Sequence, residues 1–237
     1  AVIGKALKGG WRERVFLASK VSGHYSGQAI RNAIETSLRE LQTEHVDLYQ
    51  IHWWNSQYPI DESMETMERL RQEGKTRYIG VSNFNVDQMR VASQTAPFHS
   101  LQPRYNLLDR EIETEIIRYC ETQGIGILAH SPLAKGLLTG KYTPDYQFPA
   151  DDERSQSPRF QGEQFRHYLA KTDKLKAIAQ RRNLTLVQLA IGWLLRLPAI
   201  TCVLVGAKNP AQVAEHVGGQ GWKLSDEELK EIENVLS

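Results

Sequence analysis

The sequence predicts an α/β fold built on parallel strands. Short apolar runs alternate along the chain with segments whose apolar residues recur at helical spacing. The runs are apolar almost throughout, which is typical of strands that are covered on both faces. Because parallel neighbours are joined by a crossover connection, usually a helix, this alternation favours a parallel sheet flanked by helices.

Six strands are expected from these runs. They lie at residues 15–18, 46–52, 78–81, 100–102, 125–129 and 201–205. Helical spacing over residues 30–41, behind a candidate cap at Ser26, predicts a helix between the first two strands. Two later helices are expected to end at Gly74 and Gly124, the second beginning at Ile112, since a glycine commonly ends a helix.

The stretch 142–166 interrupts this alternation. It is rich in Pro, Asp, Ser, Gln and Arg and nearly free of aliphatic residues, which predicts a long surface loop. Helices are expected again at residues 168–182 and 184–196, and one more follows the last strand. The sequence Ser225-Asp226-Glu227-Glu228 has the form of a capping box and opens that final helix.

A count of six strands is two fewer than the eight that close a (β/α)8 TIM barrel. The chain also opens, at residues 1–7, on a sequence resembling the end of a helix. A barrel therefore predicts two strands upstream of Ala1, a span of roughly 60 residues. Residues 1–237 are expected to form a single barrel domain that is incomplete at its N-terminus.

Composition excludes several classes of function. The net charge is +1 and both signs are interspersed, so no nucleic-acid partner or membrane surface is expected. No segment approaches the roughly 20 apolar residues that span a bilayer. Cys120 and Cys202 belong to no CxxC pair or Cys/His cluster, which predicts two reduced core thiols, no metal site and a cytoplasmic location.

Polar side chains follow the expected strands in order. In a parallel α/β barrel the carboxyl ends of the strands face the active site. A lone Lys or His at a strand end is more often a solvated or hydrogen-bonded structural residue. An ordered set from successive strands instead predicts convergence on one pocket. The set contains Lys20, His52, Ser82, Asn83, Gln102, His130 and Lys208.

Three long segments resemble the aldo-keto reductase family, and in particular its bacterial and potassium-channel β-subunit-related branch. They are DLYQIHW at residues 47–53, GKTRYIGVSNF at 74–84 and SPLAKGLLTGKY at 131–142. The resemblance extends from residue 1 to residue 237. It implies the barrel fold, NADP(H) as cofactor, and reduction of aldehydes and ketones to alcohols by hydride transfer.

The resemblance also implies a catalytic tetrad of Asp, Tyr, Lys and His, of which Lys20 and His52 match the last two. In this family the Tyr is the general acid. A phenol with a pKa of about 10 is a weak acid at neutral pH unless a cation such as Lys20 favours its ionised form. The family's Asp and Tyr fall upstream of Ala1, and Tyr25 and Tyr58 belong to different loops. No general acid is therefore assigned.

The remaining site residues are also implied by the resemblance. Ser82, Asn83 and Gln102 would hold the nicotinamide carboxamide, and His130 would stack on the ring. The adenosine end and its 2′-phosphate, with Lys208 as the phosphate cation, would meet Gly206, Lys208, Gln212, Glu215 and His216. The pyrophosphate would be wrapped by Ser131, Pro132, Leu133 and Gly136, without a GxGxxG motif.

Trp53 and Trp54 are expected to line the substrate mouth, with core or rim packing as an equal alternative. Two other functions stay open. The first is a regulatory subunit that binds the nicotinamide nucleotide with little turnover, so that substrate turnover distinguishes it from the expected reductase. The second is an aldolase or isomerase on the same barrel, in which Lys20 forms a Schiff base.

Overall fold

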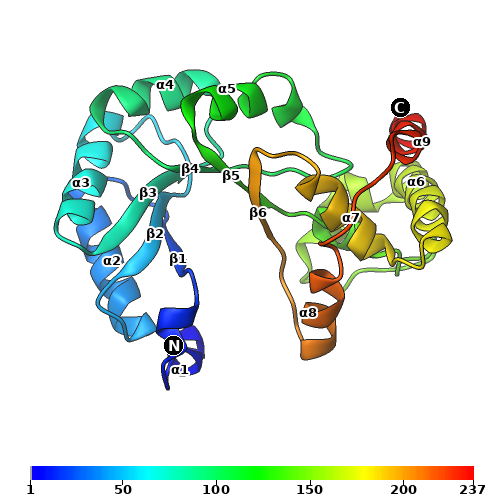
Figure 1. Cartoon of the computed structure of the whole chain (residues 1–237), viewed down its shortest axis with the longest axis horizontal. Helices are drawn as coiled ribbons and strands as arrows, with labels where there is room; N and C mark the ends of the chain where they lie inside the picture. Colours follow the sequence, from blue (N-terminus) through cyan, green and yellow to red (C-terminus); the bar gives the residue numbers. More distant parts are fainter. Residues whose placement is uncertain (1) are drawn as a thin grey trace. The chain divides into compact units, whose positions relative to one another are not determined.

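The computed structural model of the protein describes residues 2–237, which form two compact units (Figure 1). The first unit contains the described residues up to 103 together with 112–128, and the second contains 104–111 and 129–237. Each unit has its own buried apolar residues, such as Ile79 in the first and Trp193 in the second.

The first unit is built on a parallel sheet, as the sequence predicts. Its strands, paired in chain order, are β1 (Ala18–Val21), β2 (Val46–Ile51), β3 (Thr76–Ser82), β4 (Ser100–Gln102) and β5 (Gly126–His130), the last two residues of which belong to the second unit. The register sets Lys20 opposite Gln50, and Ser82 opposite Gln102. Because all these strands run in the same direction, their carboxyl ends share one edge of the sheet.

Helices cover the outer side of the sheet of the first unit, and all but the first of them follow a strand (Figure 1). They are α1 (Val2–Ala6), α2 (Gly27–Leu41), α3 (Ile60–Gln72), α4 (Val86–Thr95) and α5 (Ile116–Gln123). Helix α2 buries Ile30, Ile34 and Leu38, the face that its sequence periodicity indicates. No helix within residues 2–237 has the length and apolar character needed to cross a bilayer.

The sequence predicts the first strand at residues 15–18, but β1 begins only at Ala18. Val15 and Phe16 are exposed, so this part of the apolar run is not covered by the unit. Pairing with β2 starts at Ala18, opposite Leu48. Lys20 therefore lies within the strand rather than after it.

The helices of the first unit differ from the predictions in three respects: one boundary, one cap and one additional helix. Ile112 lies in a separate 3-10 turn, and α5 begins later, at Ile116. Its end is as predicted, because Gly124 takes a left-handed φ of 66°. Ser26 precedes α2, but its side chain makes no capping bond. Helix α4, which the sequence analysis did not predict, begins with a capping box at Asn85.

The second unit is mainly helical. Besides β6 (Ile200–Leu204) it contains α6 (Gly162–Arg181), α7 (Leu186–Leu195), α8 (Pro210–Val217) and α9 (Asp226–Leu236). Helix α7 is buried along most of its length, and α6 packs against both α7 and α9. The predicted capping box is present, since the Ser225 hydroxyl accepts the Glu228 N–H.

The stretch 142–166 is largely the exposed loop that its composition predicts, up to residue 161, but it is not without packing. It carries an aromatic cluster whose ring centroids lie 4.7–6.2 Å apart, made by Tyr142, Tyr146, Phe148, Phe160 and Phe165. Aromatic burial thus replaces the missing aliphatic residues. Two 3-10 turns, Glu153–Gln156 and Pro158–Phe160, lie in this segment, and α6 begins at Gly162 rather than at residue 168.

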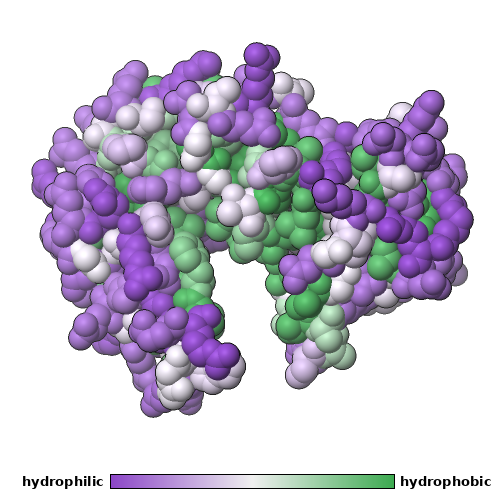
Figure 2. Space-filling view, in the orientation of Figure 1, coloured by the Kyte–Doolittle hydropathy of each residue, from purple (hydrophilic) through white to green (hydrophobic). Residues whose placement is uncertain are grey.

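Cys202 differs from its predicted environment. Cys120 is buried, as expected, whereas Cys202 is exposed, and both thiols are free. Only Ile200 of β6 is buried, so this strand presents side chains to solvent. Figure 2 shows hydrophobic surface in the region of β6 and α8, where Val213 and Val217 are more than half exposed.

Asp47 joins the amino ends of the first three strands. Its buried carboxylate accepts the Leu17 N–H at 2.8 Å and pairs with Arg12 at 2.9 Å and Arg77 at 3.0 Å. Burial alone would raise the pKa of Asp47, but the N–H donor and the two guanidinium groups outweigh burial and lower it. The ionised carboxylate therefore stabilises the folded first unit.

We expect Asp47→Asn to lower the free energy of unfolding by about 2–3 kcal/mol at neutral pH, because it removes the charge from a buried network. Since the folded pKa is depressed, the stabilisation is complete above the ordinary Asp pKa of about 4 and is lost as pH falls toward the folded value. Urea unfolding at several pH values measures this. The difference between the two proteins should shrink at acid pH. The exposed pair of Asp87 and Arg90 supplies the control, Asp87→Asn, which should cost less than about 1 kcal/mol.

Candidate active site

The carboxyl ends of β1, β3 and β4 bring Lys20, Ser82 and Gln102 into one hydrogen-bonded group. The Lys20 ammonium donates to Gln102 Oε1 at 2.7 Å. The Ser82 hydroxyl donates to the Gln102 backbone carbonyl, also at 2.7 Å. Ser82 and Gln102 are buried, so this part of the predicted set does converge in the first unit.

Asn83 is fixed beside them by its backbone and its side chain. Its φ of 58° is left-handed, a conformation that Asn adopts more readily than most residues. Its N–H donates to the Gln102 carbonyl at 3.1 Å. Its side-chain nitrogen donates to Ser82 Oγ at 3.0 Å and to the His52 carbonyl at 3.3 Å. Asn83 thereby ties the end of β2 to the ends of β3 and β4.

Lys20 influences His52 electrostatically. Desolvation lowers the pKa of His52, and the positive charge of Lys20 lowers it further. Desolvation also lowers the pKa of Lys20. A neutral imidazole offers one N–H donor and one acceptor, and Lys20 offers further N–H donors beside it. The N–H donors of Lys20 and His52 can bind and polarise a carbonyl oxygen.

The two tryptophans after His52 take different environments. Trp53 is 52% exposed, and its ring centroid lies 5.7 Å from that of His52. Trp54 instead packs edge-on against Phe84, at 5.4 Å between ring centroids, and Phe84 is buried. The packing alternative thus describes Trp54, whereas Trp53 has the exposed face that a substrate contact requires.

The loops that follow β1 and β2 meet each other, which the sequence did not indicate. The Tyr58 hydroxyl lies 2.6 Å from His24 Nδ1, and its ring lies 5.9 Å from that of Tyr25. Loop contacts of this kind have no periodicity that a sequence could reveal. The hydroxyl of Tyr58 is thus hydrogen-bonded to His24 rather than to Lys20.

In the second unit, His130 ends β5 and is followed by a backbone of unusual conformation. Its Nδ1 lies 2.9 Å from Ser131 Oγ. Left-handed φ values occur at Ser131 (56°), Ala134 (47°), Lys135 (54°) and Gly136 (101°). The Ala134 N–H donates to the Ser131 carbonyl at 3.0 Å and the Gly136 N–H to the Leu133 carbonyl at 2.8 Å, so backbone hydrogen bonds close this turn. Pro132 and Leu133 lie in the same turn, before the 3-10 segment Ala134–Thr139.

Arg154 supports this turn, and the sequence analysis missed it. Its guanidinium donates to the Lys135 carbonyl at 3.0 Å and to the Tyr142 hydroxyl at 2.7 Å. The Asp152 carboxylate pairs with it in turn. A Cβ added at Gly136 would lie 2.8 Å from the Tyr142 hydroxyl, so glycine is required for this approach. No sequence signal links Arg154 to a loop so far before it in the chain.

The residues expected at the adenosine end lie around the beginning of α8. Asn209 caps this helix by accepting the Gln212 N–H at 3.0 Å. Gln212 Oε1 accepts the Lys208 N–H at 2.7 Å, which leaves the exposed Lys208 ammonium outside this contact. Gly206 precedes the group, and Glu215 and His216 lie on α8. The side chain of Gln212 therefore supports the turn that presents Lys208.

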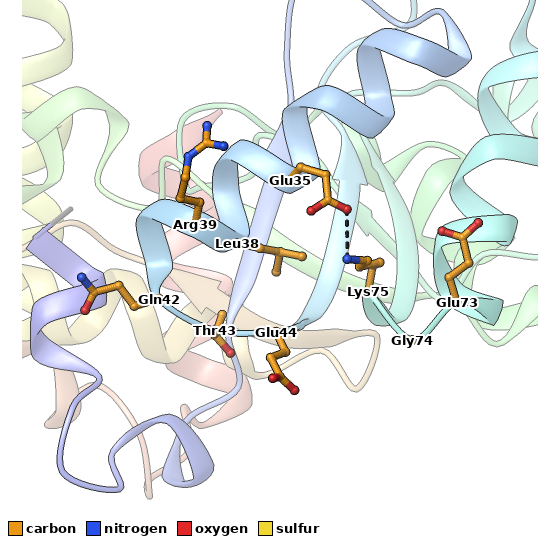
Figure 3. Close-up of a pocket in the computed structure, with 9 residues that line it drawn as sticks. All are labelled: Glu35, Leu38, Arg39, Gln42, Thr43, Glu44, Glu73, Gly74 and Lys75. Atoms are coloured by element: carbon orange, nitrogen blue, oxygen red, sulfur yellow. Dashed lines mark ion pairs between the residues drawn. The ribbon is translucent and has the colours of Figure 1, made fainter.

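A pocket of about 750 Å³ lies at the opposite end of the first unit, where α2 and α3 end (Figure 3). Its polar lining includes Glu35 and Lys75, whose charged atoms pair at 3.0 Å. The lining residues precede β2 and β3 rather than follow them. The active sites of parallel barrels lie at the carboxyl ends of the strands, so this pocket is not part of the candidate site.

Comparison with known proteins gives consistent matches. The family model described as "Aldo/keto reductase family" matches residues 1–237. The chain is 39% identical to aldo-keto reductase YhdN of Bacillus subtilis, an alignment that covers 99% of this chain and 74% of that protein. It is 32% identical to the aldo-keto reductase yakc [NADP(+)] of Schizosaccharomyces pombe, over 94% of this chain and 70% of that protein.

Solved structures agree with these matches. The glycerol dehydrogenase AKR11B4 of Gluconobacter oxydans superposes with a TM-score of 0.92 at 37% identity, over 99% of this chain and 76% of that one. An aldo/keto reductase of Klebsiella pneumoniae, solved with NADP and acetate, gives 0.80 at 30% identity, over 99% and 74%. The predicted α/β class and its relation to the (β/α)8 barrel are confirmed.

We expect Lys20→Met to raise the pKa of His52, because the substitution removes the neighbouring positive charge while leaving the desolvation of the imidazole largely in place. NMR titration of the His52 ring protons measures the change. Lys223→Met, a matched substitution of an exposed lysine in the second unit, should leave this titration unmoved. An unchanged His52 curve in the Lys20 variant would refute the electrostatic coupling.

Proposed function

The chain belongs to the aldo/keto reductase family, and from this premise we propose that the Lys20, His52, Ser82, Asn83 and Gln102 group is its site of NADP(H)-dependent carbonyl reduction. The product is an alcohol. The observation that carries the assignment is the hydrogen bond between the Lys20 ammonium and the buried Gln102 amide, which joins the candidate catalytic lysine to the candidate cofactor residues.

The residues present fit a nicotinamide carboxamide. That group has an amide oxygen and an amide nitrogen, so its site must supply both donors and acceptors. Ser82, Asn83 and Gln102 supply a hydroxyl and two amides, held together by hydrogen bonds and only partly accessible at Asn83. When bound, the reduced cofactor supplies the hydride that the carbonyl carbon receives.

Lys20 and His52 act on the carbonyl oxygen in this proposal. His52 stays neutral at pH 7, because desolvation and Lys20 lower its pKa, and it orients the substrate by a hydrogen bond. The Lys20 charge stabilises negative charge that develops on the oxygen, and it lowers the pKa of a weak acid placed beside it. We assign no general acid within residues 2–237, since the hydroxyl of Tyr58 is bonded to His24.

Exposed Trp53 forms the proposed wall of the substrate mouth. Its indole offers a broad apolar face next to His52, which suits the carbon skeleton of an aldehyde or ketone. Trp54, packed on Phe84, supports this wall from within the same unit.

The second unit carries the proposed phosphate contacts. The tight turn from Ser131 to Gly136 is the segment proposed to wrap the pyrophosphate, and His130 precedes it as the proposed stacking residue. Lys208, next to the beginning of α8, is the proposed cation for a 2′-phosphate. We also propose a cytoplasmic location, because Cys120 and Cys202 are both free thiols.

NADPH is expected to bind the protein with micromolar-class affinity, measured by fluorescence titration, and Asn83→Ala should weaken binding about tenfold or more. The substitution removes two side-chain hydrogen bonds and strains a left-handed residue. Asn183→Ala is the matched control, since Asn183 is also left-handed (φ 56°) but belongs to the second unit and makes none of these hydrogen bonds. Tight NADPH binding without any carbonyl turnover would instead favour a regulatory subunit.

Lys208→Ala should weaken NADPH much more than NADH, because only NADPH carries the 2′-phosphate that this ammonium is proposed to bind. Parallel titrations with the two cofactors measure the ratio of their dissociation constants. Lys223→Ala, which removes another exposed lysine of the second unit, should change neither. Equal losses for NADPH and NADH would show that Lys208 does not distinguish them.

A further inference from the structure

We infer that Gln50 is a positioning residue of the candidate site, which fixes the end of the Gln102 amide that faces Lys20. The inference deepens the proposed function and rests on it. Gln50 lies in the middle of the sheet on β2, and neither its position nor its residue type singled it out in the sequence.

Gln50 is the central member of a row of contacts across the sheet. The strand register sets Lys20 opposite Gln50, Gln50 opposite Gly80, and Gly80 opposite Ser100. Gln50 Oε1 accepts a hydrogen bond from Gln102 Nε2 at 2.8 Å. Gln50 Nε2 donates to Ser100 Oγ at 3.3 Å and more weakly to a backbone carbonyl at 3.4 Å. Gln50 is fully buried and Gln102 is only 3% exposed.

At each end of this row stands a group that can only donate or only accept a hydrogen bond. These two groups fix the orientation of the Gln50 and Gln102 amides between them. The carbonyl of Val81 can only accept a hydrogen bond, so Gln50 turns its nitrogen toward it and its oxygen toward Gln102. The ammonium of Lys20 can only donate, so Gln102 turns its oxygen toward it. A flip of either amide would set two donors or two acceptors face to face in a buried place.

The sheet leaves space for this arrangement at Gly80. A Cβ added there would lie 2.2 Å from Ser100 Oγ and 3.3 Å from Gln50 Cγ. Any side chain at position 80 would displace the hydroxyl that Gln50 contacts. The absence of a side chain at Gly80 thus leaves room for the Ser100 hydroxyl and for the buried amide of Gln50 that contacts it.

The fixed polarity has a consequence for each end of the site. The Gln102 oxygen stabilises the charged form of Lys20, and a flipped amide would direct N–H groups at the ammonium. A single amide orientation also presents one pattern of donor and acceptor toward the proposed nicotinamide carboxamide. Such an ordered partner binds more tightly than one that must be ordered on binding.

Two substitutions separate polarity from packing. Gln50→Met keeps an unbranched side chain of similar length but loses both polar atoms. Gln50→Glu keeps an acceptor toward Gln102, whether or not its carboxyl is protonated. In the free protein, NMR titration of the Lys20 side chain should show a lower pKa in Gln50→Met than in the unsubstituted protein. In Gln50→Glu the pKa should not fall below the unsubstituted value, because an ionised carboxylate would add a negative charge near the ammonium. The NADPH dissociation constant should rise about threefold to tenfold in Gln50→Met.

Thr76→Val is the control, because Thr76 is a buried polar residue of the same sheet near its other end. It should move neither the Lys20 titration nor NADPH binding. An unchanged Lys20 titration in Gln50→Met would overturn the inference. Because that titration uses no cofactor, it tests Gln50 even if the unsubstituted protein fails to bind NADPH, a result that would overturn the proposed function instead.

Hydrogen exchange of the Gln102 side chain tests the inference without any substitution, in case Gln50→Met does not fold. The Nε2 proton held by Gln50 should exchange far more slowly than the side-chain amide protons of exposed Gln28. Exchange of both Gln102 protons at the rate of Gln28 would contradict a fixed amide.

Discussion

The hydrogen bond from the Lys20 ammonium to the Gln102 amide is the interaction on which the candidate site depends. It joins a residue of β1 to a residue of β4. The two strands that lie between them in the sheet, β2 and β3, contribute further buried polar residues, Gln50 and Ser82. Buried amides must be paired, so the position of the lysine and the orientation of the glutamine are set together. The side chain of Asn83 then adds the end of β2 to the same group, and its backbone N–H bonds the Gln102 carbonyl.

The two edges of this sheet use polar residues differently. At the amino edge, the Asp47 carboxylate pairs with Arg12 and Arg77, and these ion pairs hold three strands in place. At the carboxyl edge, Lys20 has a neutral amide as its partner and a histidine whose pKa it lowers. A positive charge that is not neutralised by a carboxylate stays effective toward a ligand. Stability is thus concentrated at one edge and chemistry at the other.

The sequence predicted those features that follow from strand periodicity. Ser82, Asn83 and Gln102 were expected to meet, because parallel strands end at one edge, and they do. Periodicity does not distinguish covered from exposed apolar runs, so the first strand was placed at residues 15–18, where Phe16 is exposed. It also missed Gln50, because a polar residue within a buried strand has no recognisable spacing. The same limit applies to Arg154, whose contacts depend on how a long loop folds back.

Gly80 has a consequence for how this protein can change over evolutionary time. Its missing side chain makes room for Ser100 and Gln50, which in turn orient Gln102. A new residue at one of these four positions alters the surroundings of the other three, so the effect of each substitution depends on those already present. Neutral drift at these positions is therefore constrained to concerted replacements, whereas exposed residues on the covering helices are free to vary one at a time.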